Sequence, residues 1–436
     1  MSADAKKLQA AEEKKQKLQQ SALDVDFETS VPEDKCRNKV PRLDDLCVRY
    51  LADHFDKYPA LDHIKQEYVA AVVELINTSK ISYSAASKYI KNEMFWKKST
   101  LERWPQTPHE ISEHGMSWRR LYAELHITER FERFFPSKCG STLQNLIQEV
   151  ECAKPFVQTI RFRQLRTKID LSKVLGDFQN LQTLDLTYGK KKVGMGYEKS
   201  LFGMHLTDAM SLSRLIANSR ALTRVVLQEN LIDDETVHVI GSGLAKNNTV
   251  TYLDLSHNCI ADRGAERLAK LLQRGSMLID IDLSDNQIGD LGAGYLADAL
   301  RLNDVLSTLS LRQNLLSDNG GEEVLDALVE NSSLSELDLS ANELEAKTGG
   351  KLLQILRSND ALTTLNLACN SVITDEEGKL LIGALEKNAT LTKLDLRKNA
   401  DAKVLGPIKK LLKPRAVKEK QVSRKRYQNG WDLVDD

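Results

Sequence analysis

The chain repeats one pattern at a fixed interval. Seven asparagines at positions 230, 258, 286, 314, 342, 370 and 399 are separated by 28, 28, 28, 28, 28 and 29 residues, and each closes a segment of the form LxxLxLxxN. A fixed period in the twenties with this pattern is typical of a leucine-rich-repeat solenoid. Such a chain presents a long surface, and we therefore expect it to bind other molecules and not to catalyse a reaction.

Each part of the repeat has a physical role. Leu253 and Leu255 alternate with Asp254, so that the two leucines point into the core of a short strand while the aspartate points out. The amide of the asparagine can satisfy backbone groups that the turn after the strand leaves unpaired. An Asp then recurs at positions 234, 262, 290 and 318, and we expect it to be the N-cap of the helix that follows.

The predicted fold class is therefore α/β, a curved horseshoe of the ribonuclease-inhibitor type with parallel strands inside and helices outside. We expect strands near residues 252–255, 280–283, 308–311, 336–339, 364–367 and 393–396.

The composition of the sequence and the spacing of its apolar residues divide the chain into four regions. Residues 1–41 form a charged tail that Pro32 and Pro41 interrupt. Residues 42–155 hold most of the aromatic residues and have apolar residues at helical spacing, which predicts an all-helical domain that caps the N-terminal edge of the solenoid. Residues 156–412 are the expected leucine-rich-repeat domain, and residues 413–436 are a basic C-terminal tail.

Composition excludes some classes of protein. The net charge is −1 with 28% charged residues, which gives no overall electrostatic preference for a partner. The chain has no run of 18 apolar residues and no signal peptide at its start, so we expect no membrane association. The six cysteines lack CxxC spacing, and we interpret them as free thiols of an intracellular protein.

Two motifs resemble catalytic or nucleotide sites but have the wrong spacing. His109 and His114 frame two glutamates as HEISEH, whereas a zinc protease needs its histidines four residues apart on one helical face. The loop from Gly189 to Gly196 has Met195 where a phosphate-binding loop needs lysine. We expect no catalytic residue, no metal and no cofactor.

The residue between the two strand leucines points into the horseshoe and is often acidic. Five of the eight residues in this column are aspartates, which indicates an acidic stripe for a basic partner. Because the sequence Leu-Asp-Leu is also common in such repeats, solvated charges without a partner are the alternative. The candidate partner-binding residues are Asp254, Asp282, Asp338 and Asp395.

A second charged feature lies near the C-terminus. Nine Lys or Arg residues face one acid, Glu419, between positions 409 and 426. The segment predicts contacts with an acidic neighbour, and a solvated tail is the alternative. Because the only aromatic residue nearby is Tyr427, we do not expect nucleic acid to bind. We expect the two charged features on different parts of the molecule. The candidate contacts are Lys409, Lys410, Lys413, Arg415, Arg424, Lys425 and Arg426.

The residues outside the repeats resemble a known family. The stretches concerned are Tyr58–Ile64, Trp96–Lys98, Leu101–Pro105, His114–Arg120, Leu184–Tyr188 and, within the insertion, Gly194, Met195 and Glu198–Phe202. They are similar to dynein regulatory complex subunit 5, also called the T-complex-associated testis-expressed protein family, from about residue 45 to 400. The insertion is the most specific part, because ordinary leucine-rich repeats lack it.

The resemblance implies a non-catalytic scaffold of the axonemal nexin–dynein regulatory complex that helps to regulate dynein-driven ciliary and flagellar motility. Its implied partners are other subunits of that complex, with doublet microtubules and inner-arm dynein as further candidates. Its implied location is the cytoplasm and cytoskeleton, in the axoneme of a cilium or flagellum.

Two other classes remain as alternatives. The stretch from Phe95 to Trp104, followed by Trp118–Tyr122, also resembles the end of an F-box, which would make the chain a substrate receptor of a ubiquitin ligase, but the usual Leu-Pro opening is missing. The same horseshoe type occurs in the Ran GTPase-activating protein, whose long acidic tail differs from the basic end of this chain.

Overall fold

The computed structural model of the protein describes residues 42–55, 57, 61, 64–107, 110–134, 140–165, 169–176, 178–189, 202–273, 275–400 and 403–415. The expected N-terminal tail, residues 190–196 of the glycine-rich loop, and residues 416–436 of the expected basic tail lie outside these ranges. The chain forms two compact units, Met1–Tyr50 and Leu51–Asp436, and each is described by itself.

The first part of the described chain is helical, as the spacing of its apolar residues predicts. The helices are α2 (Leu43–Asp53), α3 (Gln66–Leu75), η1 (Thr78–Lys80), α4 (Tyr83–Tyr89), α5 (Glu93–Arg103), η2 (Ile111–His114), α6 (Trp118–Arg133) and α7 (Gly140–Ala153). Side chains of Ser82, Asn92 and Ser117 accept hydrogen bonds from the first turns of α4, α5 and α6, which explains where these helices begin. The division at residues 42–155 remains a proposal.

The aromatic residues of this region form its core. The rings of Tyr83, Trp96 and Tyr122 contact one another at centroid distances between 5.1 and 6.4 Å. The Trp96 indole is 1% exposed and donates a hydrogen bond of 3.1 Å to the carbonyl of Ile90. The Trp96 indole is therefore buried with its N–H group hydrogen-bonded.

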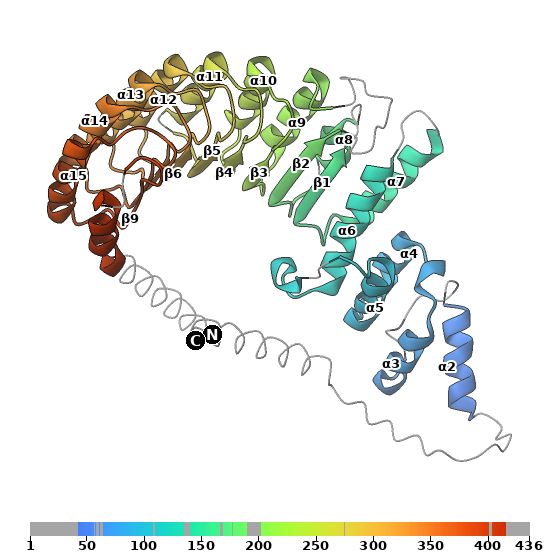
Figure 1. The fold of residues 1–436 in the computed structure, drawn as a ribbon. Helices are drawn as coiled ribbons and strands as arrows, with labels where there is room; N and C mark the ends of the chain where they lie inside the picture. Colours follow the sequence, from blue (N-terminus) through green and yellow to red (C-terminus); the bar gives the residue numbers. More distant parts are fainter. Residues whose placement is uncertain are drawn as a thin grey trace, which may run out of the picture. The chain divides into compact units, whose positions relative to one another are not determined.

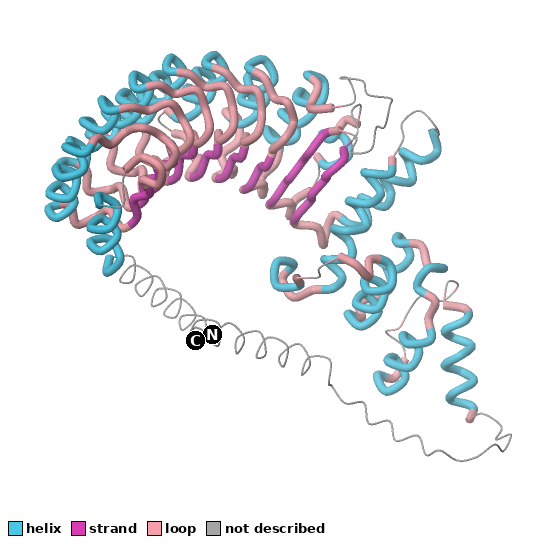
Figure 2. Tube along the Cα trace, in the orientation of Figure 1, coloured by secondary structure: helices cyan, strands magenta, loops and turns pink. Residues whose placement is uncertain are grey.

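Nine parallel strands form one sheet in chain order, which confirms the predicted fold class. The strands line the inner side of an arc and helices α9–α15 its outer side (Figures 1 and 2). The strands are β1 (Thr159–Leu165), β2 (Thr183–Tyr188), β3 (Arg224–Val226), β4 (Tyr252–Asp254), β5 (Asp280–Asp282), β6 (Thr308–Ser310), β7 (Glu336–Asp338), β8 (Thr364–Asn366) and β9 (Lys393–Asp395).

The helices between the strands follow the same period. They are α8 (Leu171–Leu175), α9 (Leu206–Asn218), α10 (Asp234–Leu244), α11 (Asp262–Leu272), α12 (Asp290–Leu302), α13 (Asp318–Glu330), α14 (Ala346–Ser358) and α15 (Asp375–Lys387). Residues 403–415 form a further helix, so residues 413–415 of the expected tail belong to it. Helices α10 to α15 each place a leucine in a buried column that runs through the array. These leucines are Leu244, Leu272, Leu300, Leu328, Leu356 and Leu385.

The periodic asparagines form the ladder that their chemistry predicts. The amide nitrogen of Asn258 donates to the carbonyls of Leu227 and Leu255, at 3.0 and 2.8 Å. Its amide oxygen accepts from the backbone N–H groups of Asn230 and Ile232 in the preceding repeat, both at 3.0 Å. One side chain thus satisfies backbone groups in two repeats, and this prediction is confirmed.

The residue before each ladder asparagine has left-handed backbone geometry. Its φ lies between 53° and 67° in all seven repeats, and none of the seven is glycine. For an L-amino acid other than glycine this conformation costs roughly 1–2 kcal/mol. The bonds of the asparagine therefore hold a turn that the chain would otherwise avoid. The seven residues are Glu229, His257, Asp285, Gln313, Ala341, Cys369 and Lys398.

The prediction that the periodic aspartates cap their own helices is wrong. Asp262 is the first residue of α11, and its Oδ1 accepts from the backbone N–H groups of Gly289 and Gly292 at the start of the next helix, at 2.8 and 2.9 Å. Asp234, Asp290 and Asp318 make the corresponding pair of bonds to the helix that follows theirs. Each aspartate therefore links its own repeat to the next one by hydrogen bonds, and it caps the next helix and not its own.

These bonds explain the glycines at the third position of the helices. A Cβ on Gly292 would lie 2.7 Å from the Asp262 carboxylate, and a Cβ on Gly320 would lie 2.6 Å from that of Asp290. Glycine leaves room for the carboxylate to approach the backbone N–H.

A second ladder of asparagines, which the sequence analysis did not identify, lies at the other end of the helices. The amide nitrogen of Asn331 donates to the carbonyls of Leu300 and Asn303, at 2.7 and 2.9 Å. Asn359 repeats the pattern on Leu328 and Asn331, at 2.7 and 3.0 Å. Carbonyls at the helix C-termini, which have no partner within their own helix, are thereby satisfied from the next repeat.

Candidate partner-binding site

The structure places the predicted acidic column in one row across the sheet. The register pairs Asp254 with Asp282, Asp282 with Ser310, and Ser310 with Asp338, and the row ends at Asp395. A neighbouring row carries Asp280 and Glu336. The centre of the concave face, over β5 to β7, is therefore acidic.

Asp254 needs a correction as a candidate contact, because it is only 3% exposed. Its Oδ2 accepts from the amide of Gln228 at 2.5 Å, and its Oδ1 accepts from the backbone N–H and the hydroxyl of Ser256 at 3.0 and 2.7 Å. A partner could reach this carboxylate only by breaking those bonds. Pointing into the horseshoe does not make a side chain accessible there.

Asp282 and Asp338 are half-buried. Asp282 uses its Oδ1 internally, whereas Asp338 uses both oxygens, because its Oδ2 accepts from the amide of Asn366 at 2.8 Å. Asp282 Oδ1 accepts from the backbone N–H of Ser284 at 2.9 Å, and Asp338 Oδ1 accepts from that of Ser340 at 2.8 Å. The sequence Asp-Leu-Ser thus closes the turn after the strand. Both residues remain proposed contacts, Asp282 through its Oδ2 and Asp338 through an Oδ2 that it shares with Asn366.

Asp395 is held by Arg397, which the sequence analysis did not single out. The Arg397 guanidinium contacts both oxygens of the carboxylate, at 2.7–3.0 Å. Partial burial raises the pKa of Asp395, but the bonds from Arg397 and the charges of Arg397 and Lys409 outweigh it, so that the pKa lies below its usual range. The carboxylate is therefore ionised and largely neutralised by its neighbours.

The described part of the basic segment lies on the helix of residues 403–415. Lys409, Lys410 and Lys413 are exposed there. Arg415 needs a correction, because its guanidinium donates to the carbonyls of Leu385 and Leu391, at 2.7 and 3.1 Å. Arg424, Lys425 and Arg426 lie outside the described residues.

The expectation that the acidic column and the basic segment lie apart is wrong at Asp395. A cavity of about 500 Å³ brings Asp395 and Arg397 together with Lys393, Lys409 and Lys413. Lys393 is not among the predicted contacts, because it lies in the repeat and outside the basic segment, but its position one residue before Leu394 places it on the concave face. We call this space the C-terminal cavity.

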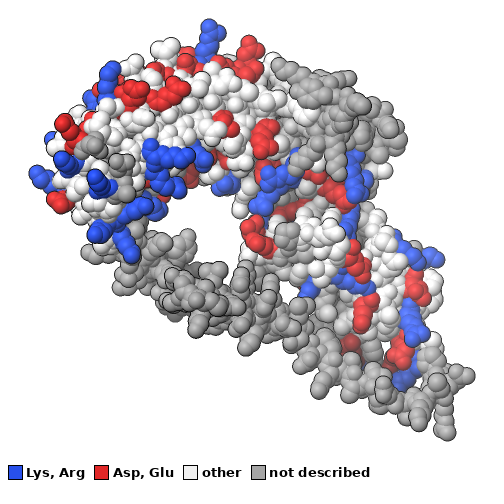
Figure 3. Space-filling view, in the orientation of Figure 1, with Lys and Arg blue, Asp and Glu red and all other residues white. Residues whose placement is uncertain are grey.

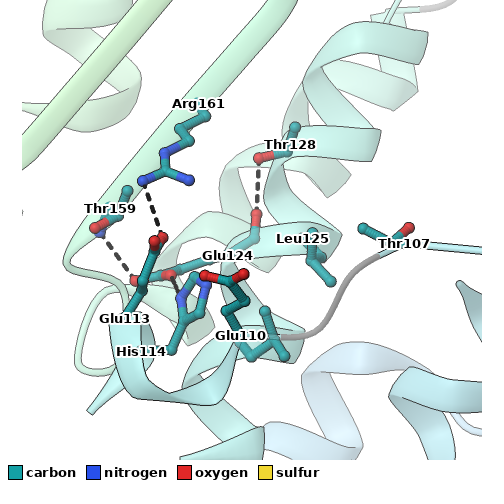
Figure 4. Close-up of a pocket in the computed structure, with 10 residues that line it drawn as sticks. Thr107, Glu110, Glu113, His114, Glu124, Leu125, Thr128, Thr159 and Arg161 are labelled. Carbon is teal, nitrogen blue, oxygen red and sulfur yellow. Dashed lines mark hydrogen bonds and ion pairs between the residues drawn. The ribbon is translucent and has the colours of Figure 1, made fainter. Parts of the chain in front are cut away.

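A second cavity, of about 310 Å³, lies where α6 meets β1 (Figure 4). Its carboxylate Glu124 is buried, and Oε1 accepts from the backbone N–H groups of Gln158 and Thr159, at 3.0 and 2.9 Å. His114 and Arg120 also contact this carboxylate. Burial raises the pKa of Glu124, but these hydrogen bonds together outweigh it and lower the pKa.

The hydrogen bonds to Glu124 satisfy backbone N–H groups at the first edge of the sheet. In the next repeat the corresponding N–H groups of Gln182 and Thr183 donate to the carbonyl of Gln158, at 2.8 and 3.0 Å. In the sheet of the described residues no strand precedes β1, so carboxylates of α6 take the place of that carbonyl. Glu132 likewise accepts from the backbone N–H of Arg163 at 2.7 Å. His114 of the HEISEH motif thus has a structural role, because it contacts the glutamate that connects α6 to the edge of the sheet.

Arg415 has the matching role at the opposite end. The carbonyl of Leu385 corresponds to that of Leu356, which Asn388 of the following repeat contacts at 3.1 Å. The helix of residues 403–415 ends the described array, and there Arg415 supplies the donor. Acids accept from the N–H groups at one end of the array and a base donates to the carbonyls at the other.

Neither a metal-binding cluster nor a membrane-spanning helix is present among the described residues. No group of three or more His, Cys, Asp or Glu side chains is arranged there to hold a metal ion. Within the same ranges, every helix is too short or too polar to cross a bilayer. His109 and the core of the glycine-rich loop lie outside those ranges.

The family model agrees with the fold. The family model described as Leucine Rich repeat matches residues 246–269, 276–297 and 358–380. Among solved structures, an internalin (inlF) from Listeria monocytogenes covers 62% of this chain and 68% of its own, with 18% identity and a TM-score of 0.37. The Leiomodin-1 actin-binding site 2 covers 38% and 96%, with 18% identity and a TM-score of 0.34. At such scores neither structure bears on function.

The curated relatives carry one name. Dynein regulatory complex subunit 5 of Chlamydomonas reinhardtii is 34% identical over 203 residues, which are 46% of this chain and 51% of the relative. The proteins of the same name from Mus musculus and Homo sapiens are 30% identical over 46% of this chain and 45% of their own length. The chain spans about half the length of the curated relatives that it matches. The resemblance to dynein regulatory complex subunit 5 that the non-repeat residues indicated is confirmed, and the chain is a leucine-rich-repeat protein with homologues of that name.

Proposed function

We propose that the chain is a non-catalytic scaffold subunit of the nexin–dynein regulatory complex, located in the axoneme of cilia or flagella. The observation that carries this proposal is the 34% identity to a protein named as subunit 5 of that complex. The fold supports it, because a solenoid with a long concave face is suited to binding other proteins.

The proposed partners are other subunits of the complex, with doublet microtubules and inner-arm dynein as further candidates. The acidic centre of the concave face is the proposed contact for a basic segment of one such subunit. The residues that we propose for this contact are Asp282 and Asp338 from the first row, with Asp280 and Glu336 in the neighbouring row. Through these contacts the subunit would help to regulate dynein-driven bending.

The proposal is tested in cells that lack their own subunit 5. A tagged copy of the chain should sediment with purified axonemes and restore motility. A chain that stays in the soluble fraction, or that co-purifies with the adaptor of a ubiquitin ligase, would contradict the proposal.

The face is tested with a variant that keeps the turns intact. Since Asp282 and Asp338 use Oδ1 for a turn, Asn and not Lys is the suitable replacement. The variant Asp280→Asn, Asp282→Asn, Glu336→Gln and Asp338→Asn removes four negative charges, and we expect it to fold but to assemble poorly.

A matched control removes four exposed acids from helices and helix ends. It consists of Asp304→Asn, Glu330→Gln, Glu376→Gln and Glu386→Gln. Equal assembly of the two variants would show that the acidic row is only repeat consensus.

A further inference from the structure

The C-terminal cavity carries an unbalanced positive charge. Four basic side chains and one carboxylate line it, and Arg397 already contacts that carboxylate, Asp395. Among the described residues, no ion pair is found for Lys393, Lys409 or Lys413. Four positive charges and one negative charge therefore leave a net charge of +3 in the cavity.

The fold holds the lysines in this arrangement. The helix of residues 403–415 buries Val404, Ile408 and Leu412 against the last repeat, with 2–8% exposure. Lys409 and Lys413 each follow a residue of this buried stripe, so they lie side by side, one turn apart, at the mouth of the cavity. Like charges four residues apart on a helix repel each other, and an anion between them would relieve that repulsion.

Basic side chains gather at the inner edge of the arc at its C-terminal end (Figure 3). The cavity is too large for a single small anion, and Leu365, Leu394 and Leu412 add apolar walls. None of the described residues that line it is aromatic, so they offer no stacking platform for a base. A peptide with several carboxylates fits this chemistry better than a phosphate ion or a nucleic acid.

We propose that the C-terminal cavity is the docking site for an acidic segment of a partner protein, with Lys393, Lys409 and Lys413 as its contacts. This inference rests on the proposed scaffold function, because it names the chemistry of one partner. The ordinary pairing of carboxylates with lysines would fix the segment, and the apolar walls would favour an aliphatic residue among its acids.

The neighbouring charges limit where the acidic segment can lie. Strands stand about 4.8 Å apart, so Glu336 and Asp338 of β7 lie roughly 10 Å from β9. An acidic segment that ran further along the concave face would meet these acids. A partner that occupies the whole face must therefore carry acids over β9 and bases over β5 to β7.

The test uses the full chain and a fluorescein-labelled peptide of ten glutamates, with binding measured by fluorescence anisotropy at low salt. The variant Lys409→Gln with Lys413→Gln should bind the peptide about tenfold more weakly. The matched control, Lys403→Gln with Lys410→Gln, removes the same charge from the same helix at exposed positions that do not line the cavity, and should change the affinity less than about twofold. Circular dichroism should show that both variants are folded.

Three results would overturn the inference. Equal weakening by both pairs would indicate a general attraction to a basic helix, and a lack of peptide binding by the unmodified chain would remove the site. Tighter binding of a ten-nucleotide RNA with the same dependence on Lys409 and Lys413 would assign the cavity to phosphates. Replacement of both lysines by arginine should preserve peptide binding.

The scaffold function and the docking site can be refuted independently of each other. If the chain enters axonemes but the two lysine pairs behave alike, only the docking site is wrong. If the cavity variant loses the peptide but the chain does not enter axonemes, only the assignment to the dynein regulatory complex is wrong.

Discussion

Asn286→Ala should destabilise the protein by about 1–3 kcal/mol, and the structure shows why the value is not larger. The Asn286 side chain makes three donor bonds, to the carbonyls of Leu255, Leu283 and Ser284, at 3.0, 3.0 and 3.2 Å. Its Oδ1 accepts from the backbone N–H of Ile260 at 3.0 Å. The side chain is 7% exposed, so water does not easily replace it.

The four hydrogen-bond partners of the Asn286 side chain are affected unequally when that side chain is removed. The carbonyl of Leu255 keeps a bond from Asn258 at 2.8 Å, and that of Leu283 keeps one from Asn314 at 2.9 Å. Only the N–H of Ile260 loses the one acceptor that the described residues offer it. A single buried donor without a partner costs about 1–3 kcal/mol, whereas the carbonyls lose only a second bond each.

The assay is urea denaturation followed by circular dichroism and by tryptophan fluorescence, with coincident transitions required before a free energy is taken. Hydrogen exchange at the Ile260 amide should accelerate in the variant. The control Gln287→Ala, at the exposed neighbouring residue, should change the free energy of unfolding by less than about 0.5 kcal/mol. A loss from Asn286→Ala as small as that of the control would refute the ladder as a source of stability.

Three further changes test the aspartate bonds between repeats, the left-handed turns and the buried Glu124 carboxylate. Asp262→Ala should cost about 1 kcal/mol in the same urea assay, because Gly289 and Gly292 lose a shared acceptor, and an unchanged midpoint would count against coupling between repeats. Ala341→Gly should raise the free energy of unfolding by up to about 1 kcal/mol, because glycine accepts φ of 57° without strain, and a clear loss would contradict this. The pKa of Glu124 is lowered in the fold, so its contribution is complete above the unfolded pKa of about 4.3 and is lost as pH falls through the lower folded pKa. Glu124→Gln should therefore flatten the decline of the melting temperature on acidification, and parallel declines would argue against it.

The sequence alone predicts what repeats within one unit, namely the strand leucines, the ladder asparagines and the parallel order of the strands. It misassigned the aspartates at 234, 262, 290 and 318, because spacing does not show whether a side chain serves its own helix or the next one. A clue was present: Gly264, Gly292 and Gly320 each follow such an aspartate by 30 residues, which is where the carboxylate needs room. The second ladder was also visible as Asn303, Asn331 and Asn359, each 28 residues apart.

The candidate site was harder to predict, because accessibility depends on neighbours in other repeats. Asp254 has the same place in its strand as Asp282, yet Gln228 of the preceding repeat covers it. The end caps Glu124, Glu132 and Arg415 occur once each and follow no period. The C-terminal cavity requires the helix of residues 403–415 to lie against β9, and no repeat pattern determines that contact.

We propose that the concave face of this scaffold holds another subunit of the dynein regulatory complex. The most direct measurement is photo-cross-linking in intact axonemes, with the cross-linking amino acid in place of Ser310 on β6, at the centre of the concave face. The account predicts a cross-link from this position to another subunit of the complex, and none to that subunit from the exposed Glu330 on α13. A chain that is incorporated into axonemes but yields no protein cross-link from Ser310 would show that the concave face is empty and that the scaffold binds through another surface.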